Sequence, residues 1–174
     1  MKASKFLVLA GGILGILAFF LPMVSVTRQG HTATVSALQV MKGLDAVSTE
    51  LDKDDVKTQA AAYGETGSLK SAKDGVDGIK GIVMAIFAPA LLLAFIGGMG
   101  VARKKFGRVA GTFSLLFGLL GLGIGAILKS AAEGDSGIGL TLLLVTGVLG
   151  IVGGILALAK PERLAGIAQV RAAA

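Results

Sequence analysis

Four long apolar segments, separated by polar stretches, set the pattern of this chain. A helix that crosses about 30 Å of hydrocarbon needs roughly 20 apolar residues. Four segments reach that length without an Asp, Glu, Lys, Arg or His, namely 6–26, 82–101, 109–128 and 137–159. The pattern therefore predicts an all-α membrane protein: a four-helix transmembrane bundle, one domain over 1–174, with a tail at 160–174.

The first apolar segment also has one feature of a secretory signal peptide, because Lys2 and Lys5 precede it. Its apolar run is longer than the roughly 7–15 residues typical of such peptides. The stretch 21–26 offers no clear pair of small residues for cleavage. We therefore expect this segment to remain as the first span.

Lys and Arg residues gather on one side of the predicted spans. The N-terminus, the connection after the second span and the tail together carry nine bases and one acid. The 27–81 loop carries seven bases and eight acids, and the 129–136 loop carries one base and two acids. Because basic segments stay in the cytoplasm, we expect a multi-pass protein of the plasma (inner) membrane with both termini cytoplasmic and the 27–81 loop outside.

The 27–81 loop is too long for a simple connection, and its first half carries helix signals. Ser36 and Gln39 have the spacing of a capping box, in which each side chain bonds a backbone amide of the other residue. Apolar residues then recur at steps of three and four, which predicts one apolar helical face, made of Leu38, Met41, Leu44, Val47 and Leu51.

The rest of the loop predicts further short elements. Asp52 is placed to cap a second helix from Lys53 to about Ala62, and the 64–68 stretch is a turn by composition. A helix beginning at 71–74 can run into the second span, whereas the alternating Thr and Val of 29–35 favour an extended strand. Together these signals predict a small helical extracytoplasmic cap between the first two spans.

Small residues at four-residue spacing predict where the spans pack together. Lipid is as apolar as Leu, so helix association in a membrane depends on close backbone contact. The expected contacts are Gly11, Gly15, Ala94, Gly98, Gly121, Gly125, Gly150 and Gly154. Pro89 interrupts the second span and is expected to bend it; the bend could also shape a cavity.

The composition excludes most site chemistry. The chain has no Cys, so thiol catalysis and zinc–thiolate sites are excluded. His31 is the only histidine, and the acidic cluster Asp52, Asp54 and Asp55 lacks the Gly and terminal Glu of a calcium loop. We expect no catalytic residue, no metal and no cofactor. The net charge of +6 comes from bases at membrane boundaries, which does not favour nucleic-acid binding.

Four spans, cytoplasmic termini and a long first outside loop resemble the plan of the claudins. The resemblance is one of topology. Claudins carry a Trp and a pair of Cys in that loop, and this chain has neither residue. The resemblance therefore implies no functional residue here.

These patterns favour a non-catalytic membrane protein, an accessory or scaffold subunit that contacts a partner through the outside loop. The partner would be another membrane protein or a second copy, and the loop stripe from Leu38 to Leu51 would be the contact if it is not buried within the chain itself. The alternative function is an oligomeric small channel or transport component. The basic connection formed by Arg103, Lys104, Lys105 and Arg108 is expected either to contact the headgroups of membrane lipids or only to set the topology.

Overall fold

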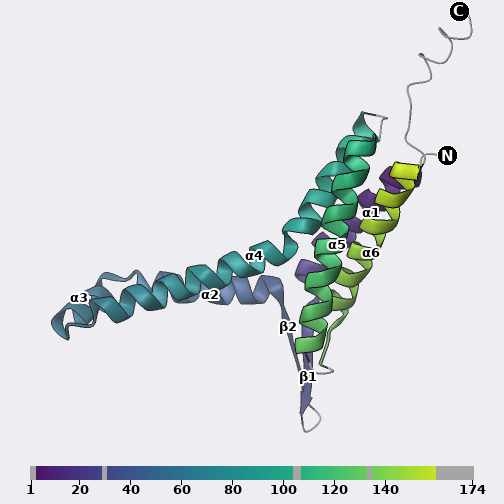
Figure 1. Ribbon diagram of the computed structural model, residues 1–174. Helices are drawn as coiled ribbons and strands as arrows, with labels where there is room; N and C mark the ends of the chain where they lie inside the picture. The colour runs from purple at the N-terminus through teal and green to yellow at the C-terminus, as the bar shows by residue number, and fades with distance from the viewer. Residues whose placement is uncertain (1–2, 29–30, 104–106, 133–134, 160–174) are drawn as a thin grey trace, which may run out of the picture.

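The computed structural model of the protein describes residues 3–28, 31–103, 107–132 and 135–159 (Figure 1). Its elements in chain order are α1 (Ala3–Phe20), β1 (Pro22–Arg28), β2 (His31–Ser36), α2 (Ala37–Leu51), α3 (Asp54–Ala62), α4 (Thr66–Ala102), α5 (Arg108–Ala131) and α6 (Ile138–Ala159). Within these residues, the helices long and apolar enough to cross a membrane are α1, α4, α5 and α6.

These four helices pack side by side as a bundle. α6 packs between α1 and α5, and α4 packs against both α1 and α5. Leu93 of α4 and Leu140 and Leu143 of α6 are among the largest fully buried side chains. Near one end, the rings of Phe19 and Phe87 meet edge to face with their centroids 5.0 Å apart. Side chains therefore fill the centre of the bundle.

The first span is shorter than predicted, and the fold is not purely helical. α1 ends at Phe20 and not near Val26, because Pro22, which has no backbone N–H, begins strand β1. β1 and β2 form an antiparallel hairpin that pairs Val26 with Ala33. The extended strand expected at 29–35 corresponds to β2. Alternating Val and Thr side chains favour strand over helix here.

The hairpin is tied to the beginning of α6. The N–H of Gly137 donates to the Met23 carbonyl at 2.7 Å, and the N–H of Ser25 donates to the Asp135 carbonyl at 2.8 Å. A side chain at Gly137 would place its Cβ 2.2 Å from the Pro22 oxygen. We call this end of the bundle the hairpin end and the opposite end the N-terminal end.

The predicted loop helices exist, but Figure 1 shows that they project away from the bundle as an arm instead of covering its end. The arm consists of α2, α3 and the outer part of α4, 66–81. α4 is continuous over 37 residues and contains Pro89, and it bends where it passes from the arm into the bundle (Figure 1). Proline is the usual cause of such a bend.

Two ion pairs fix how α2 lies against α4 in the arm. Lys80 reaches Asp45 at 2.8 Å, and Lys73 reaches Asp52 at 2.7 Å. Asp52 lies seven residues after Asp45, and Lys73 lies seven residues before Lys80. The two helices are therefore antiparallel and in constant register over two turns.

Local capping agrees with the sequence at one helix and differs at the next. The capping box is confirmed: the Gln39 N–H donates to the Ser36 hydroxyl, and the Ser36 N–H donates to the Gln39 side chain at 2.9 Å. The prediction that Asp52 caps α3 is wrong. Lys53 is the N-cap of α3 without a side-chain bond, and Asp52 ends α2. Its carboxylate is held by Lys73 instead.

Candidate functional site

The arm has a seam, where α2 meets α4, and a separate apolar face beside it. Buried and half-buried positions follow the steps of three and four that pack helices together. In α2 these are Ala37, Met41, Leu44, Ser48 and Leu51, and in α4 they are Leu69, Lys73, Val76, Lys80, Val83 and Phe87. Ser48, Lys73 and Lys80 interrupt this series, so the seam is only partly apolar.

The apolar face lies one residue before most of the seam positions. It consists of Val40, Gly43 and Val47 of α2 and of Ala72, Gly75 and Ile79 of α4, and it continues into the bundle at Ile82 and Ile86. Towards the tip of the arm, the polar residues Glu50 and Ser68 occupy the same side. Because α2 and α4 are antiparallel, the residue before a seam position of α2 and the residue before a seam position of α4 lie on the same side of the helix pair. Val47 and Ile79 are each 48% exposed, and Ile82 is 63% exposed. From Val40 to Val47 and from Ala72 to Ile82 the face is therefore apolar and largely uncovered.

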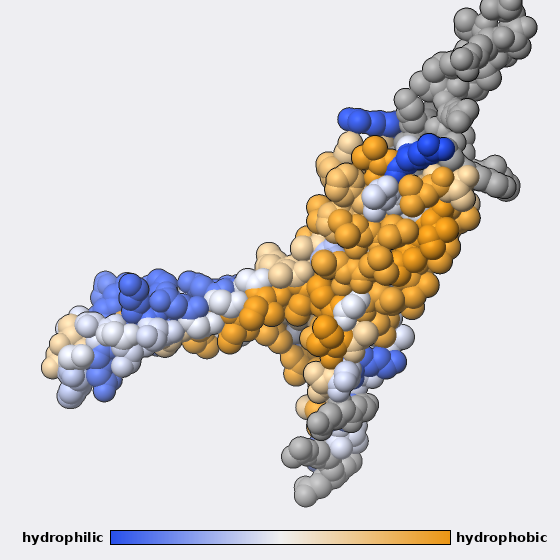
Figure 2. Space-filling model, in the orientation of Figure 1, coloured by the Kyte–Doolittle hydropathy of each residue, from blue (hydrophilic) through white to orange (hydrophobic). Residues whose placement is uncertain are grey.

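The acidic side chains that pair with α4 lie on the other side of the seam. Asp45 and Asp52 each follow a seam position of α2, and Lys80 and Lys73 reach them from seam positions of α4. Figure 2 shows hydrophilic residues along the upper edge of the arm, towards the N-terminal end of the bundle. The arm is thus amphipathic as a unit, and its two helices contribute to both sides.

The ion pair at Asp52 shifts the pKa of both partners. The hydrogen bond from Lys73 lowers the pKa of Asp52, and the hydrogen bond to Asp52 raises the pKa of Lys73. Both groups are exposed, so water weakens their attraction. The pair orients the helices more than it stabilises them.

The five residues of the predicted loop stripe do not form one uncovered surface. Met41, Leu44 and Leu51 lie in the seam and are half-buried. Leu38 is half-buried on the flank that Asp45 shares, and Val47 lies on the apolar face. The stripe therefore contributes mainly to the seam, and the α4 half of the apolar face was missed by sequence reasoning.

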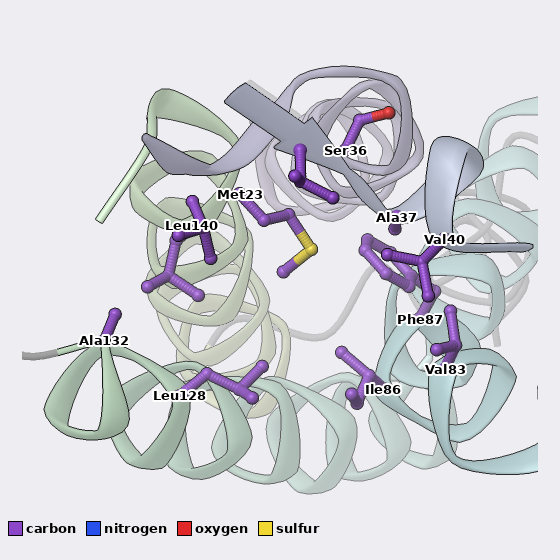
Figure 3. Close-up of a pocket in the computed structure, with 12 residues that line it drawn as sticks. Met23, Ser36, Ala37, Val40, Val83, Ile86, Phe87, Leu128, Ala132 and Leu140 are labelled. Carbon is purple, nitrogen blue, oxygen red and sulfur yellow. The ribbon is translucent and has the colours of Figure 1, made fainter. Parts of the chain in front are cut away.

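An apolar cavity lies where the arm joins the hairpin end of the bundle (Figure 3). It encloses about 190 Å³. Its lining comes from the hairpin, the first turns of α2, the part of α4 before Pro89, the end of α5 and the beginning of α6. The lining residues are Met23, Val24, Val35, Ser36, Ala37, Val40, Val83, Ile86, Phe87, Leu128, Ala132 and Leu140.

The lining of the cavity offers almost no group for hydrogen bonding. Ser36 is the one polar side chain among the lining residues that the structure describes, and its hydroxyl already accepts the Gln39 N–H at 3.2 Å. Val40 and Ile86 belong both to the cavity and to the apolar face. The face therefore runs from the cavity outward along the arm.

The residues predicted to pack the spans together differ in how closely a neighbouring helix approaches them. A Cβ at Gly15 would lie 2.4 Å from the Ala90 Cβ, and one at Gly154 would lie 2.7 Å from the Leu115 nitrogen. Gly11, Gly125 and Gly150 would meet side chains at 2.9–3.0 Å, and Ala94 lies against Gly12. Gly121 and Gly98 are looser, since their nearest neighbours are 3.7 Å and 4.0 Å away.

Other glycines that the spacing did not single out meet backbone most closely. A Cβ at Gly12 would lie 2.2 Å from the Ala94 nitrogen, and one at Gly97 would lie 2.5 Å from the Leu9 nitrogen. Gly118 and Gly147 show the same relation between α5 and α6, at 2.6 and 2.7 Å. Four-residue spacing therefore found some of the closest contacts, at Gly15 and Gly154, and missed the others.

The predicted lipid-contacting bases lie at the N-terminal end of the bundle. Arg103 ends α4 and Arg108 begins α5, and both are exposed. Lys104 and Lys105 lie outside the described residues. Arg103 borders an open apolar groove with Met99 and Val109.

Among the described residues, no group of three or more His, Asp or Glu is placed to hold a metal ion. His31 begins β2, and its backbone pairs with that of Arg28. Asp54 and Asp55 lie in the first turn of α3, where acidic side chains suit the helix dipole.

Comparisons with known proteins assign no family: no family model, curated protein or solved structure matches this chain.

Proposed function

We propose that this protein is a non-catalytic accessory or scaffold subunit of the plasma membrane that docks a helix of a partner protein on the arm. The bundle anchors it, and the bases at Lys5, Arg103 and Arg108 keep the N-terminal end in the cytoplasm. The arm then lies outside. The observation that carries the proposal is the uncovered apolar face of the arm.

The sidedness of the arm supports a protein partner over the bilayer. The apolar face meets the hairpin at the cavity, whereas the hydrophilic edge faces the N-terminal end of the bundle (Figure 2). A bilayer around the bundle would therefore lie beside the hydrophilic edge. Beyond the cavity, along the arm, the apolar face then points away from lipid, where an extracytoplasmic protein can reach it.

The glycines of the apolar face support a helix as the contacting element. A Cβ at Gly43 or Gly75 would meet nothing within 4 Å, so no contact inside the chain requires glycine there. Small residues let the backbone of another helix approach closely. Val47, Ile79 and Ile82 flank these gaps and would pack around an apolar helix of the partner.

Site-specific photo-crosslinking in native membranes tests this proposal. A photoreactive residue at Val47 or Ile79 should give an adduct with a different protein. Thr49 and Asp77, each two residues away on the opposite side of its helix, are matched controls and should not give it. An adduct of two copies of this chain, or equal labelling at the control positions, would overturn the proposal.

The orientation is tested separately. A reporter fused after Ala174 should be active only in the cytoplasm. A tag inserted at Gly64, in the exposed turn between α3 and α4 where φ is +72°, should be accessible from outside. A tag that is protected in intact cells would place the arm on the wrong side and refute the extracytoplasmic docking.

A further inference from the structure

The cavity at the root of the arm has a location that restricts its occupant. Leu128 ends the apolar part of α5, Leu140 lies in the first turns of α6, and Ile86 lies in the apolar part of α4. If the bundle spans a bilayer, these residues lie at its outer boundary, where the hydrocarbon begins. The cavity is therefore next to lipid chains, independently of any protein partner.

Its chemistry excludes polar occupants. Figure 3 shows Met23, Leu128, Ile86 and Phe87 converging on one space. Water needs several polar partners to be held in a cavity, and the Ser36 hydroxyl is already used in the capping box. Left empty, the lining would lose the dispersion contacts that close packing supplies.

Its size excludes a helix. An α-helix with side chains is about 10 Å across, which is far more than a cavity of 190 Å³ admits. A cavity of about 150 Å³ lined by apolar residues binds benzene. The present cavity therefore suits a short stretch of hydrocarbon chain.

We infer that the cavity holds the acyl chain of one membrane phospholipid, and that this chain fixes the arm to the bundle. Its walls come from both bodies: Ala37 and Val40 belong to the arm, and Leu128 and Leu140 belong to the bundle. An acyl chain between them contacts both at once. The inference rests on the membrane placement of the bundle and not on the docking of a partner.

The test is labelling by a phospholipid that carries a diazirine on one acyl chain, with the protein in phosphatidylethanolamine–phosphatidylglycerol vesicles. In the wild type, label should appear on Met23 and Ile86 as well as on Leu116 and Ile127, which are exposed on the outside of α5. Label on Leu116 and Ile127 without label on the cavity residues would overturn the inference.

A matched pair of variants sharpens the result. Val40→Trp fills the cavity, and Val47→Trp adds the same side chain one heptad further along the same face, outside the cavity. Val40→Trp should lose the label on Met23 and Ile86, and Val47→Trp should keep it. Unchanged cavity labelling in Val40→Trp would contradict the inference. If that variant does not fold, the wild-type labelling pattern decides the question.

Discussion

Glycine has opposite surroundings in the bundle and in the arm. In the bundle, a Cβ at Gly12, Gly97, Gly118 or Gly147 would lie 2.2–2.7 Å from a neighbouring backbone nitrogen. In the arm, a Cβ at Gly43, Gly67, Gly75, Gly78 or Gly81 would meet nothing within 4 Å. The same residue type therefore brings helices together in one region and leaves space beside them in the other.

This difference has an energetic consequence. Glycine in a helix costs about 0.5–1 kcal/mol relative to alanine. In the bundle, close backbone contact offsets that cost. In the arm no contact within the chain does so, which makes the arm the weaker of the two regions and leaves its apolar face open to another molecule.

The largest effect is expected from Gly118→Ala in the bundle. The added Cβ would lie 2.6 Å from the Ile151 nitrogen, and overpacking of this kind costs about 1–3 kcal/mol. The thermal unfolding midpoint in detergent should fall. Gly123→Ala in the same helix is the control, because its Cβ meets nothing within 4 Å. Equal stability of the two variants would show that close helix contact at Gly118 does not require glycine.

A variant in the seam between α2 and α4 tests whether the arm unfolds independently of the bundle. Leu44→Asp puts one charge into a half-buried seam position, where remaining access to water keeps the cost at the lower end of about 1–3 kcal/mol. Amide exchange should accelerate over α2 and the outer part of α4, while the bundle keeps its protection. Thr49→Asp, on the exposed side of α2, is the control. Loss of protection in the bundle as well would show that the two regions unfold together.

A smaller and opposite effect is expected from Gly75→Ala. Because the site is open, alanine should stabilise the α4 helix by about 0.5–1 kcal/mol, and amide exchange around position 75 should slow. The same methyl group should hinder close approach of a partner helix. Faster exchange in this variant would mean that the helix needs glycine for a reason within the chain.

The smallest effect is a pH dependence of the arm. Since Lys73 lowers the pKa of Asp52 below 3.8, this carboxylate stabilises the arm above that pH, and the contribution disappears as pH falls through the lowered pKa. The protection factors of the arm amides, which correct for the intrinsic slowing of exchange in acid, should therefore fall at acidic pH. Asp52→Asn should remove this component. An unchanged acid profile in Asp52→Asn would show that the pair does not stabilise the arm.

The sequence predicted what depends on local pattern. The Ser36–Gln39 capping box and the apolar runs of the four spans could be read from residues a few positions apart. The end of α1 was placed too late: Pro22 was expected to end or kink the span, but the apolar residues Met23, Val24 and Val26 extended the predicted boundary to 26. Asp52 was misassigned because its partner, Lys73, is 21 residues away.

Non-local geometry accounts for the remaining differences. The helices of the 27–81 loop were predicted, but the direction in which α4 leaves the bundle depends on its bend. The cavity takes residues from the hairpin and four helices, so no single pattern contains it. Likewise, the contact of Gly12 with Ala94 depends on how α1 is rotated against α4, which four-residue spacing leaves undetermined.

Paired variants of α2 decide whether the open face of the arm binds a partner protein. Val47→Asp charges the apolar face, and Thr49→Asp places the same charge on the opposite side of the same helix. Both proteins are purified in mild detergent beside the wild type, and co-purifying proteins are quantified by mass spectrometry. We expect one heteromeric partner that the wild type and Thr49→Asp retain and Val47→Asp loses, with equal thermal stability of all three. Retention of that partner by Val47→Asp, or its equal loss from both variants, would rule out the open face as the binding surface.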